Sequence, residues 1–198
     1  MKRASLAVIF LAAALSGQTL SQHDREFALS HLHATRKMLL DAIAGLSQAQ
    51  WKFKPAPQRW SIAECAEHVA LSEDFMFQRL QNMLKAPASP DKKPQFNEEE
   101  VMRAAADRTQ KVKSNEPSTQ PRGRWAAPAA PSRHFKERRD RTLQYVRTTQ
   151  DPLHSHFLGS GTPTDALDAC QWLLQIAGHT ERHVAQINEV KADPRFPK

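Results

Sequence analysis

Three histidines in two distant segments of the chain have the spacing of a metal site. His179 and His183 are four residues apart, so on a helix their imidazoles lie on one face, one turn apart. His68 lies in an earlier helical segment and could add a third imidazole from a facing helix. A divalent ion held by three protein ligands keeps positions free for water or substrate, which is typical of catalytic rather than structural sites.

The other titratable residues fit ordinary structural roles. Glu181 lies two residues after His179, about 200° around a helix, so it points away from the ligand face, unlike the glutamate of a His-Glu-x-x-His protease motif. Glu64 lies one turn before His68 and could reach a metal-bound water, but its place three residues after Ser61 predicts a capping box instead. We expect no metal role for the remaining six histidines: His23, His31, His33, His134, His154 and His156.

No motif for a hydrolytic nucleophile is found in the sequence. It has no Gly-x-Ser-x-Gly turn, no phosphate-binding glycine loop and no Cys-x-x-Cys pair. Catalysis would therefore depend on the metal, which can lower the pKa of a bound water or thiol. The two cysteines, Cys65 and Cys170, lie inside apolar helical patterns. Buried free thiols, a disulfide between the two and a reactive thiol all remain open.

Helices are the elements that would position these side chains. Apolar residues recur with a helical period, glycine is scarce and strand-like alternation is nearly absent. The pattern predicts long helices over residues 24–46, 62–85 and 133–150, a fourth from near Pro163 to about residue 190, and a shorter one over 98–111. Four long helices in a chain of this size predict an all-α fold, specifically a four-helix bundle.

Cap residues and prolines predict where these helices begin and end. Ser61 is the expected N-cap of the second long helix, with Trp60 packing against Cys65 as a hydrophobic staple. Thr162 is the expected cap of the fourth. Between the second and third long helices, residues 86–132 are rich in proline, which predicts a long, partly disordered insertion that either covers a site or is simply solvated. The third long helix is expected to expose a solvated basic face, formed by Arg133, Lys136, Arg138, Arg139 and Arg141.

The N-terminal residues have the pattern of a secretory signal peptide. Two basic residues precede the apolar run 4–15, which is short for a membrane span of about 20 residues. We expect a signal peptide over residues 1–16 with cleavage before Gly17; cleavage after Ser21 and an uncleaved anchor are the alternatives. We expect the helical bundle domain to cover residues 22–198 and the mature protein to be secreted or periplasmic. The net charge of +7 is modest and by itself no nucleic-acid signature.

The motifs resemble the DinB family of YfiT-like metal-dependent hydrolases. The letters WSIAE at 60–64, followed by His68, resemble the helix-two signature of that family. The letters HTERH at 179–183, with QWLL before them and Gln186 after them, resemble its helix-four signature. The resemblance extends from about residue 27 to residue 197 and is poor over the insertion. It implies a four-helix bundle in which His68, His179 and His183 bind a divalent metal: nickel, zinc, iron or manganese.

The resemblance leaves the reaction open. Some members of the family transfer bacillithiol or glutathione to electrophiles or isomerise maleylpyruvate with mycothiol, and many have no assigned reaction. We expect an exported metal-dependent hydrolase or thiol (S-)transferase acting on a small-molecule substrate. The alternatives are a non-enzymatic metal- or ligand-binding envelope protein, and a structural bundle whose histidines hold no metal. We expect no nucleic-acid partner and no stable membrane span after signal cleavage; Trp125 and the neighbouring Ala/Pro segment leave a homodimer open.

Overall fold

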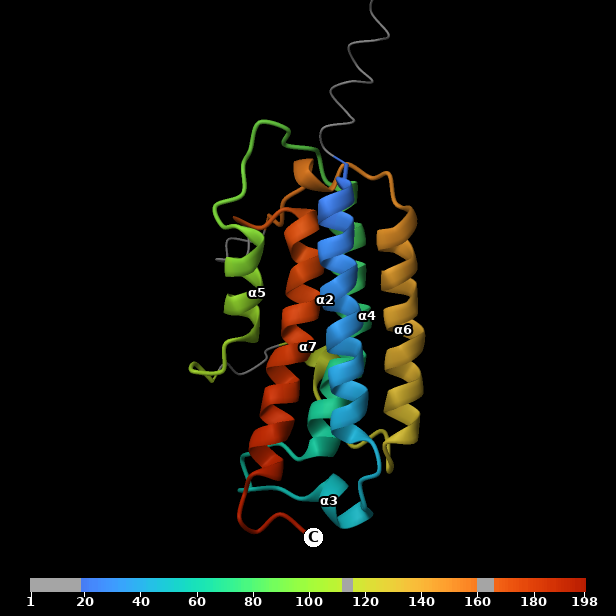
Figure 1. Ribbon diagram of the computed structural model, residues 1–198, viewed down its shortest axis with the longest axis vertical. Coiled ribbons are helices and arrows are strands. Elements are labelled where there is room, and N and C mark those ends of the chain that lie inside the picture. Colours follow the sequence, from blue (N-terminus) through green and yellow to red (C-terminus); the bar gives the residue numbers. More distant parts are fainter. Residues whose placement is uncertain (1–18, 112–115, 160–165) are drawn as a thin grey trace, which may run out of the picture.

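Four long helices lie side by side in the computed structural model (Figure 1), which describes residues 19–111, 116–159 and 166–198. Within these ranges the chain forms six α-helices, two 3-10 turns and no strand. The long helices are α2 (Gln22–Ile43), α4 (Ile62–Lys85), α6 (Ala129–Thr148) and α7 (Ala169–Lys191); the short elements are α3 (Gln48–Lys52), α5 (Glu98–Ala106), η1 (Pro117–Thr119) and η2 (Leu153–Ser155). No helix in the described ranges is long and apolar enough to cross a membrane. The expected signal peptide and its cleavage before Gly17 lie outside these ranges.

Apolar side chains hold the long helices together in two clusters. Helix α7 packs against α2, α4 and α5, and α6 packs against α2 and α4. One cluster includes Leu32 and Leu80, and the other includes Leu39 and Ile62, so α2 and α4 contribute to both. Each fully buried side chain of this size stabilises the fold by roughly 1.5–3 kcal/mol. The core therefore fixes α4 against α7, the two helices that carry the candidate ligands.

The start of α4 is as predicted. The Ser61 hydroxyl accepts a hydrogen bond from the Glu64 backbone N–H at 3.2 Å, and the Glu64 carboxylate accepts one from the Ser61 N–H at 2.7 Å. Lys54 also donates to Glu64 at 2.9 Å. This cap fixes the first residue of α4 and hence the face on which His68 lies.

Helix α7 begins later than the sequence suggested. The expected start near Pro163 is wrong, because residues 166–168 are not α-helical and the helix begins at Ala169. The N-cap is Asp168, whose carboxylate accepts from the Gln171 N–H at 2.8 Å. The Ala169 N–H donates to the His156 carbonyl at 2.8 Å, which holds the preceding residues in an extended bridge. Thr162, the expected cap, lies outside the described ranges.

Parts of the proline-rich insertion pack against the long helices. Val101, Met102 and Ala105 of α5 are buried, and α5 approaches α7 so closely that a Cβ at Gly178 would lie 2.5 Å from the Ala105 Cβ. Helix α5 ends at Ala106 rather than at the expected residue 111, because Asp107 turns the chain by accepting from the Thr109 N–H at 2.8 Å. The expectation of a simply solvated segment is therefore wrong for α5 and for η1, which contacts α4.

One arginine of the expected solvated face of α6 is fully buried. The Arg139 guanidinium donates to both carboxylate oxygens of Glu73 at 2.8 Å, to the Leu32 carbonyl at 2.8 Å, and to the hydroxyls of Thr35 and Thr180 at 2.9 Å. All five of its N–H groups are thereby used. The solvated interpretation is wrong for this residue, and the network it forms links all four long helices.

The cysteines and Trp125 are also placed by the core. Cys65 and Cys170 are buried and free, which confirms the first of the three alternatives and excludes a disulfide in this structure. Burial raises the pKa of the Cys65 thiol.

Trp125 is half-buried against the cluster that contains Cys65, and its ring lies 5.4 Å from that of His134. It therefore packs within its own chain.

Candidate metal centre

The structure brings His68 of α4 together with His179 and His183 of α7. The Nε2 atoms of His68 and His179 are 3.2 Å apart, and the ring centroid of His183 lies 4.6 Å from that of each of the other two. One ring nitrogen from each residue lies within 4.8 Å of the other two, so the group could hold a metal ion. We call these residues the three-histidine cluster.

Outer hydrogen bonds orient two of the rings. His68 is 3% exposed, and its Nδ1 lies 2.9 Å from the Thr119 carbonyl oxygen. Because a carbonyl oxygen only accepts, His68 carries its proton on Nδ1 and turns the Nε2 lone pair toward the cluster. The Nδ1 of His183 lies 2.9 Å from Oε1 of Gln186 and donates in the same way. Metal-binding histidines are commonly held by such outer hydrogen bonds.

Burial keeps the three imidazoles neutral. Desolvation lowers the pKa of His68, an effect partly offset by its bond to Thr119. It lowers the pKa of His179 to about 3, with a further contribution from the neighbouring His68. The pKa of His183 also lies well below its usual value, first through burial and then through His179. Neutral imidazole is the form that binds a metal ion, so no proton has to be removed near neutral pH.

A strap formed by residues 119–124 covers His68. Glu67, which is 2% exposed, accepts from the backbone N–H groups of Arg122 at 2.8 Å, Gly123 at 2.9 Å and Arg124 at 3.0 Å. The turn requires a positive φ of 73° at Gly123, which glycine adopts readily. Glu67 thus anchors the strap and places the Thr119 carbonyl against the neighbouring His68.

The strap, Trp60 and Ser72 are parts of this site that were not predicted from the sequence. The Trp60 ring lies 5.0 Å from His68 and 6.0 Å from His183, roughly parallel to the latter, and forms one wall of the cluster. The Ser72 hydroxyl lies 3.4 Å from the Nε2 atom of His68. Ser72 lies one turn after His68 in the sequence, and this spacing could have indicated its contact with the His68 ring. Glu67 lies directly beside His68, and this position could have indicated the strap.

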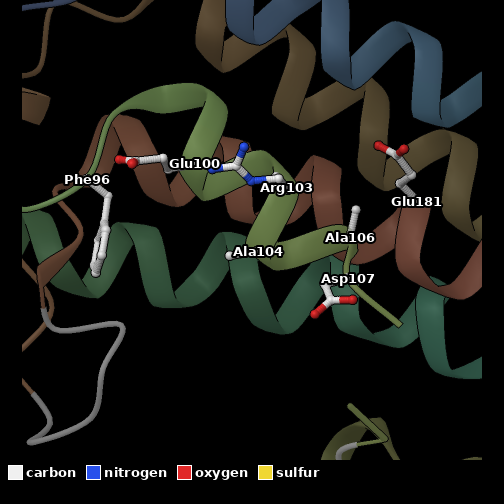
Figure 2. Close-up of a pocket in the computed structure, with 7 residues that line it drawn as sticks. All are labelled: Phe96, Glu100, Arg103, Ala104, Ala106, Asp107 and Glu181. Atoms are coloured by element: carbon white, nitrogen blue, oxygen red, sulfur yellow. The ribbon is translucent and has the colours of Figure 1, made fainter. Parts of the chain in front are cut away.

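The carboxylates considered from sequence lie elsewhere. Glu64 is held in the cap of α4, as predicted. Glu181 lines an open hollow between α7 and α5, together with Phe96 and Asp107 (Figure 2). Its side chain therefore lies on the outer surface of α7 and not on the face that carries the histidines.

Three of the remaining six histidines contact polar side chains elsewhere in the fold. His134 of α6 lies 3.1 Å from Asp74, and the exposed His33 accepts from Arg147 at 3.0 Å. His154 lies between the carboxylates of Asp24 and Asp168. His33, His134 and His154 therefore lie outside the three-histidine cluster.

Comparison with known proteins gives one match. A family model described as the DinB superfamily matches residues 31–187, a span that contains all three histidines of the cluster. No curated protein and no solved structure matches the chain.

Proposed function

The chain belongs to the DinB superfamily, and from that premise we propose that it is an exported protein that binds one divalent metal ion through His68, His179 and His183. The reaction we propose is metal-dependent hydrolysis, or transfer of a thiol, on a small molecule. The observation that carries the proposal is the convergence of three imidazoles from two helices within 4.8 Å. We further propose that α2, α4, α6 and α7 are the four-helix bundle of this family.

The donor set fits a divalent ion. Two imidazole nitrogens that bind zinc at about 2.0–2.1 Å in a tetrahedron lie roughly 3.3 Å apart, close to the 3.2 Å between His68 and His179. In the metal-free protein the same distance fits a hydrogen bond from His179 to His68. Imidazole suits zinc, nickel and iron, and three ligands leave coordination positions for substrate. A bound ion would lower the pKa of a water molecule or thiol substrate.

The chain's own residues would orient and shield that chemistry. Thr119 and Gln186 hold the rings of His68 and His183, and Trp60 forms an apolar wall. The buried Glu67 and Glu73 are committed to the strap and to Arg139. We therefore propose that neither carboxylate transfers protons during turnover.

Export favours the hydrolytic reaction, since low-molecular-weight thiols are mainly cytoplasmic. The first turn of α2 supports the earlier of the two cleavage positions. Ser21 caps that helix, because its hydroxyl accepts from the Asp24 N–H at 3.1 Å and its own N–H donates to Asp24 at 2.8 Å. Cleavage after Ser21 would remove this cap, worth about 1 kcal/mol, whereas cleavage before Gly17 retains it.

Metal content tests the site directly. The mature chain, purified without a histidine tag and reconstituted with zinc, nickel, iron or manganese, is measured by elemental mass spectrometry. We expect one ion per chain to be lost in the double variant His179→Ala/His183→Ala. The matched control, His31→Ala/His33→Ala, removes two imidazoles from α2 and should keep that ion. A metal content that is the same in the first variant as in the wild type, or no metal in the reconstituted wild type, would contradict the proposal.

Activity assays on the metal-loaded protein then distinguish the proposed functions. Ester and amide panels test hydrolysis, and thiol–electrophile pairs test transfer; turnover lost in His68→Ala with the fold intact is the expected result. Binding of the ion with no turnover on either panel would favour the metal- or ligand-binding envelope protein instead.

A further inference from the structure

A second group of metal-binding side chain types lies at the end of the molecule where α2 and α7 begin (top of Figure 1). Asp24 is in the first turn of α2, Cys170 in the first turn of α7, and His154 in η2. A carboxylate oxygen, a ring nitrogen and the Sγ atom of these residues lie within 4.8 Å of one another. Cys170 precedes His179 by nine residues, about 13 Å along a helix, so this group is separate from the three-histidine cluster.

His154 is oriented as a ligand would be. Its Nδ1 lies 2.9 Å from Oδ2 of Asp168, which is fully buried and uses its other oxygen to cap α7. Its Nε2 lies 3.3 Å from Oδ2 of Asp24. A carboxylate that accepts the N–H on one side of the ring leaves the nitrogen on the other side free to bind a cation. This is the usual outer support of a metal-binding histidine.

We propose that Asp24, His154 and Cys170 form a second site for a divalent cation of the zinc type, with Asp168 orienting the imidazole from behind. The sulfur ligand disfavours magnesium and calcium, which take oxygen, whereas zinc accepts oxygen, nitrogen and sulfur together. The 3.3 Å between Asp24 and His154 is close to the separation of roughly 3.3 Å expected of two zinc ligands. The Cys170 sulfur, which lies within 4.8 Å of both atoms, completes the set.

The position of this site indicates a structural role. An ion there would connect the first turn of α2 to η2 and to the first turn of α7, both of which lie in the C-terminal part of the sequence. His154 keeps 28% of its side chain exposed, which gives the cation a route from solvent. The expectation from sequence that His154 has no metal role did not include Asp24 and Cys170, which only the fold brings to it.

A protonated His154 bridging two carboxylates is the metal-free alternative. It accounts for the contacts of both ring nitrogens with Asp168 and Asp24, and in it the Cys170 side chain only packs in the apolar core. A probe that reports sulfur ligation therefore separates the two arrangements.

The test uses Co2+ added to the reduced mature chain. A thiolate bound to Co2+ gives a charge-transfer band in the near ultraviolet, and the three-histidine cluster contains no thiol. We expect the band in the wild type, its loss in Cys170→Ser and its retention in Cys65→Ser. Cys65 is the matched control, because it is also a buried free cysteine in a long helix. Zinc content should fall by one ion per chain in Cys170→Ser and stay unchanged in Cys65→Ser.

Further variants make the result independent of folding and of the proposed function. If circular dichroism shows that Cys170→Ser is unfolded, the partly exposed His154→Gln replaces it and should also lose the band. His68→Ala disables the three-histidine cluster and should keep the band. Absence of the band from the cobalt-saturated wild type, or its loss in Cys65→Ser, would overturn the second site.

Discussion

Replacing Arg139 by methionine should destabilise the protein more than any surface substitution on α6. Methionine has a similar length and no charge, so the change removes the guanidinium and leaves the Glu73 carboxylate, itself 2% exposed, without its cation. Removing one partner of a buried ion pair typically costs about 3–5 kcal/mol, because the remaining charge stays desolvated. Against a usual domain stability of about 5–15 kcal/mol, this is a large fraction.

The hydroxyls around Arg139 should add little to that loss. Both threonine hydroxyls that accept from Arg139 also donate to the carbonyl four residues earlier: Thr35 to His31 at 2.8 Å and Thr180 to Ile176 at 3.2 Å. They keep a partner when the guanidinium is gone. The unpaired carboxylate therefore dominates the expected loss, and removing that charge as well should restore most of the stability.

Urea unfolding followed by circular dichroism measures the effect by linear extrapolation. The double variant Arg139→Met/Glu73→Leu should recover to near the wild-type free energy of unfolding, since an apolar replacement of a buried pair is often neutral or stabilising. The control is Arg36→Met, because Arg36 pairs with Asp140 at the surface at 2.6 Å and should lose only about 0–1 kcal/mol. A loss below about 1 kcal/mol in Arg139→Met, or a double variant as unstable as the single one, would refute the reasoning.

Three other outcomes are expected. Ser61→Ala should lower the free energy of unfolding by about 1 kcal/mol through loss of the α4 cap; no change in urea unfolding would contradict the cap's role. In metal-free protein the pKa of His179, about 3, lies below its reference value of 6.5, so the unfolded chain takes up the proton first as the pH falls. Stability should then decrease below pH 6.5 by at most about 1.4 kcal/mol per pH unit from this group, and His179→Asn should flatten that slope when unfolding is followed in chelator. Glu67→Gln should loosen the strap, because a neutral amide replaces the carboxylate that accepts three backbone N–H bonds; faster tryptic cleavage after Arg122 and Arg124 would show it, and an unchanged digestion pattern would argue against the anchor.

Local patterns predicted the helices and the ligand candidates well. The range 62–85 for α4 and the Ser61–Glu64 box agree with the structure, because capping depends on residues within one turn. The spacing of His179 and His183, with His68 on a second helix, correctly indicated which imidazoles come together. The capping box and the spacing of His179 and His183 each lie within a short segment, whereas the meeting of His68 with that pair depends on the packing of α4 against α7.

Features that depend on distant partners could not be predicted. Arg139 is buried because Glu73, 66 residues earlier, faces it from α4, and nothing in the local pattern of α6 indicates this. The strap is held by Glu67, and the helical pattern of α4 does not indicate which distant N–H groups this carboxylate binds. The start of α7 was misplaced because a backbone contact with the His156 segment sets it, whereas Pro163 offered only a local signal.

The position of Trp60 gives the three-histidine cluster an intrinsic optical signal. Its indole lies 5.0 Å and 6.0 Å from two of the three rings, so its emission responds to what occupies the space between them. An open-shell ion such as Co2+ or Ni2+ bound there should quench that emission, whereas closed-shell Zn2+ should leave it bright. The choice between metals could then be followed in real time by fluorescence, without a label and without knowledge of the substrate.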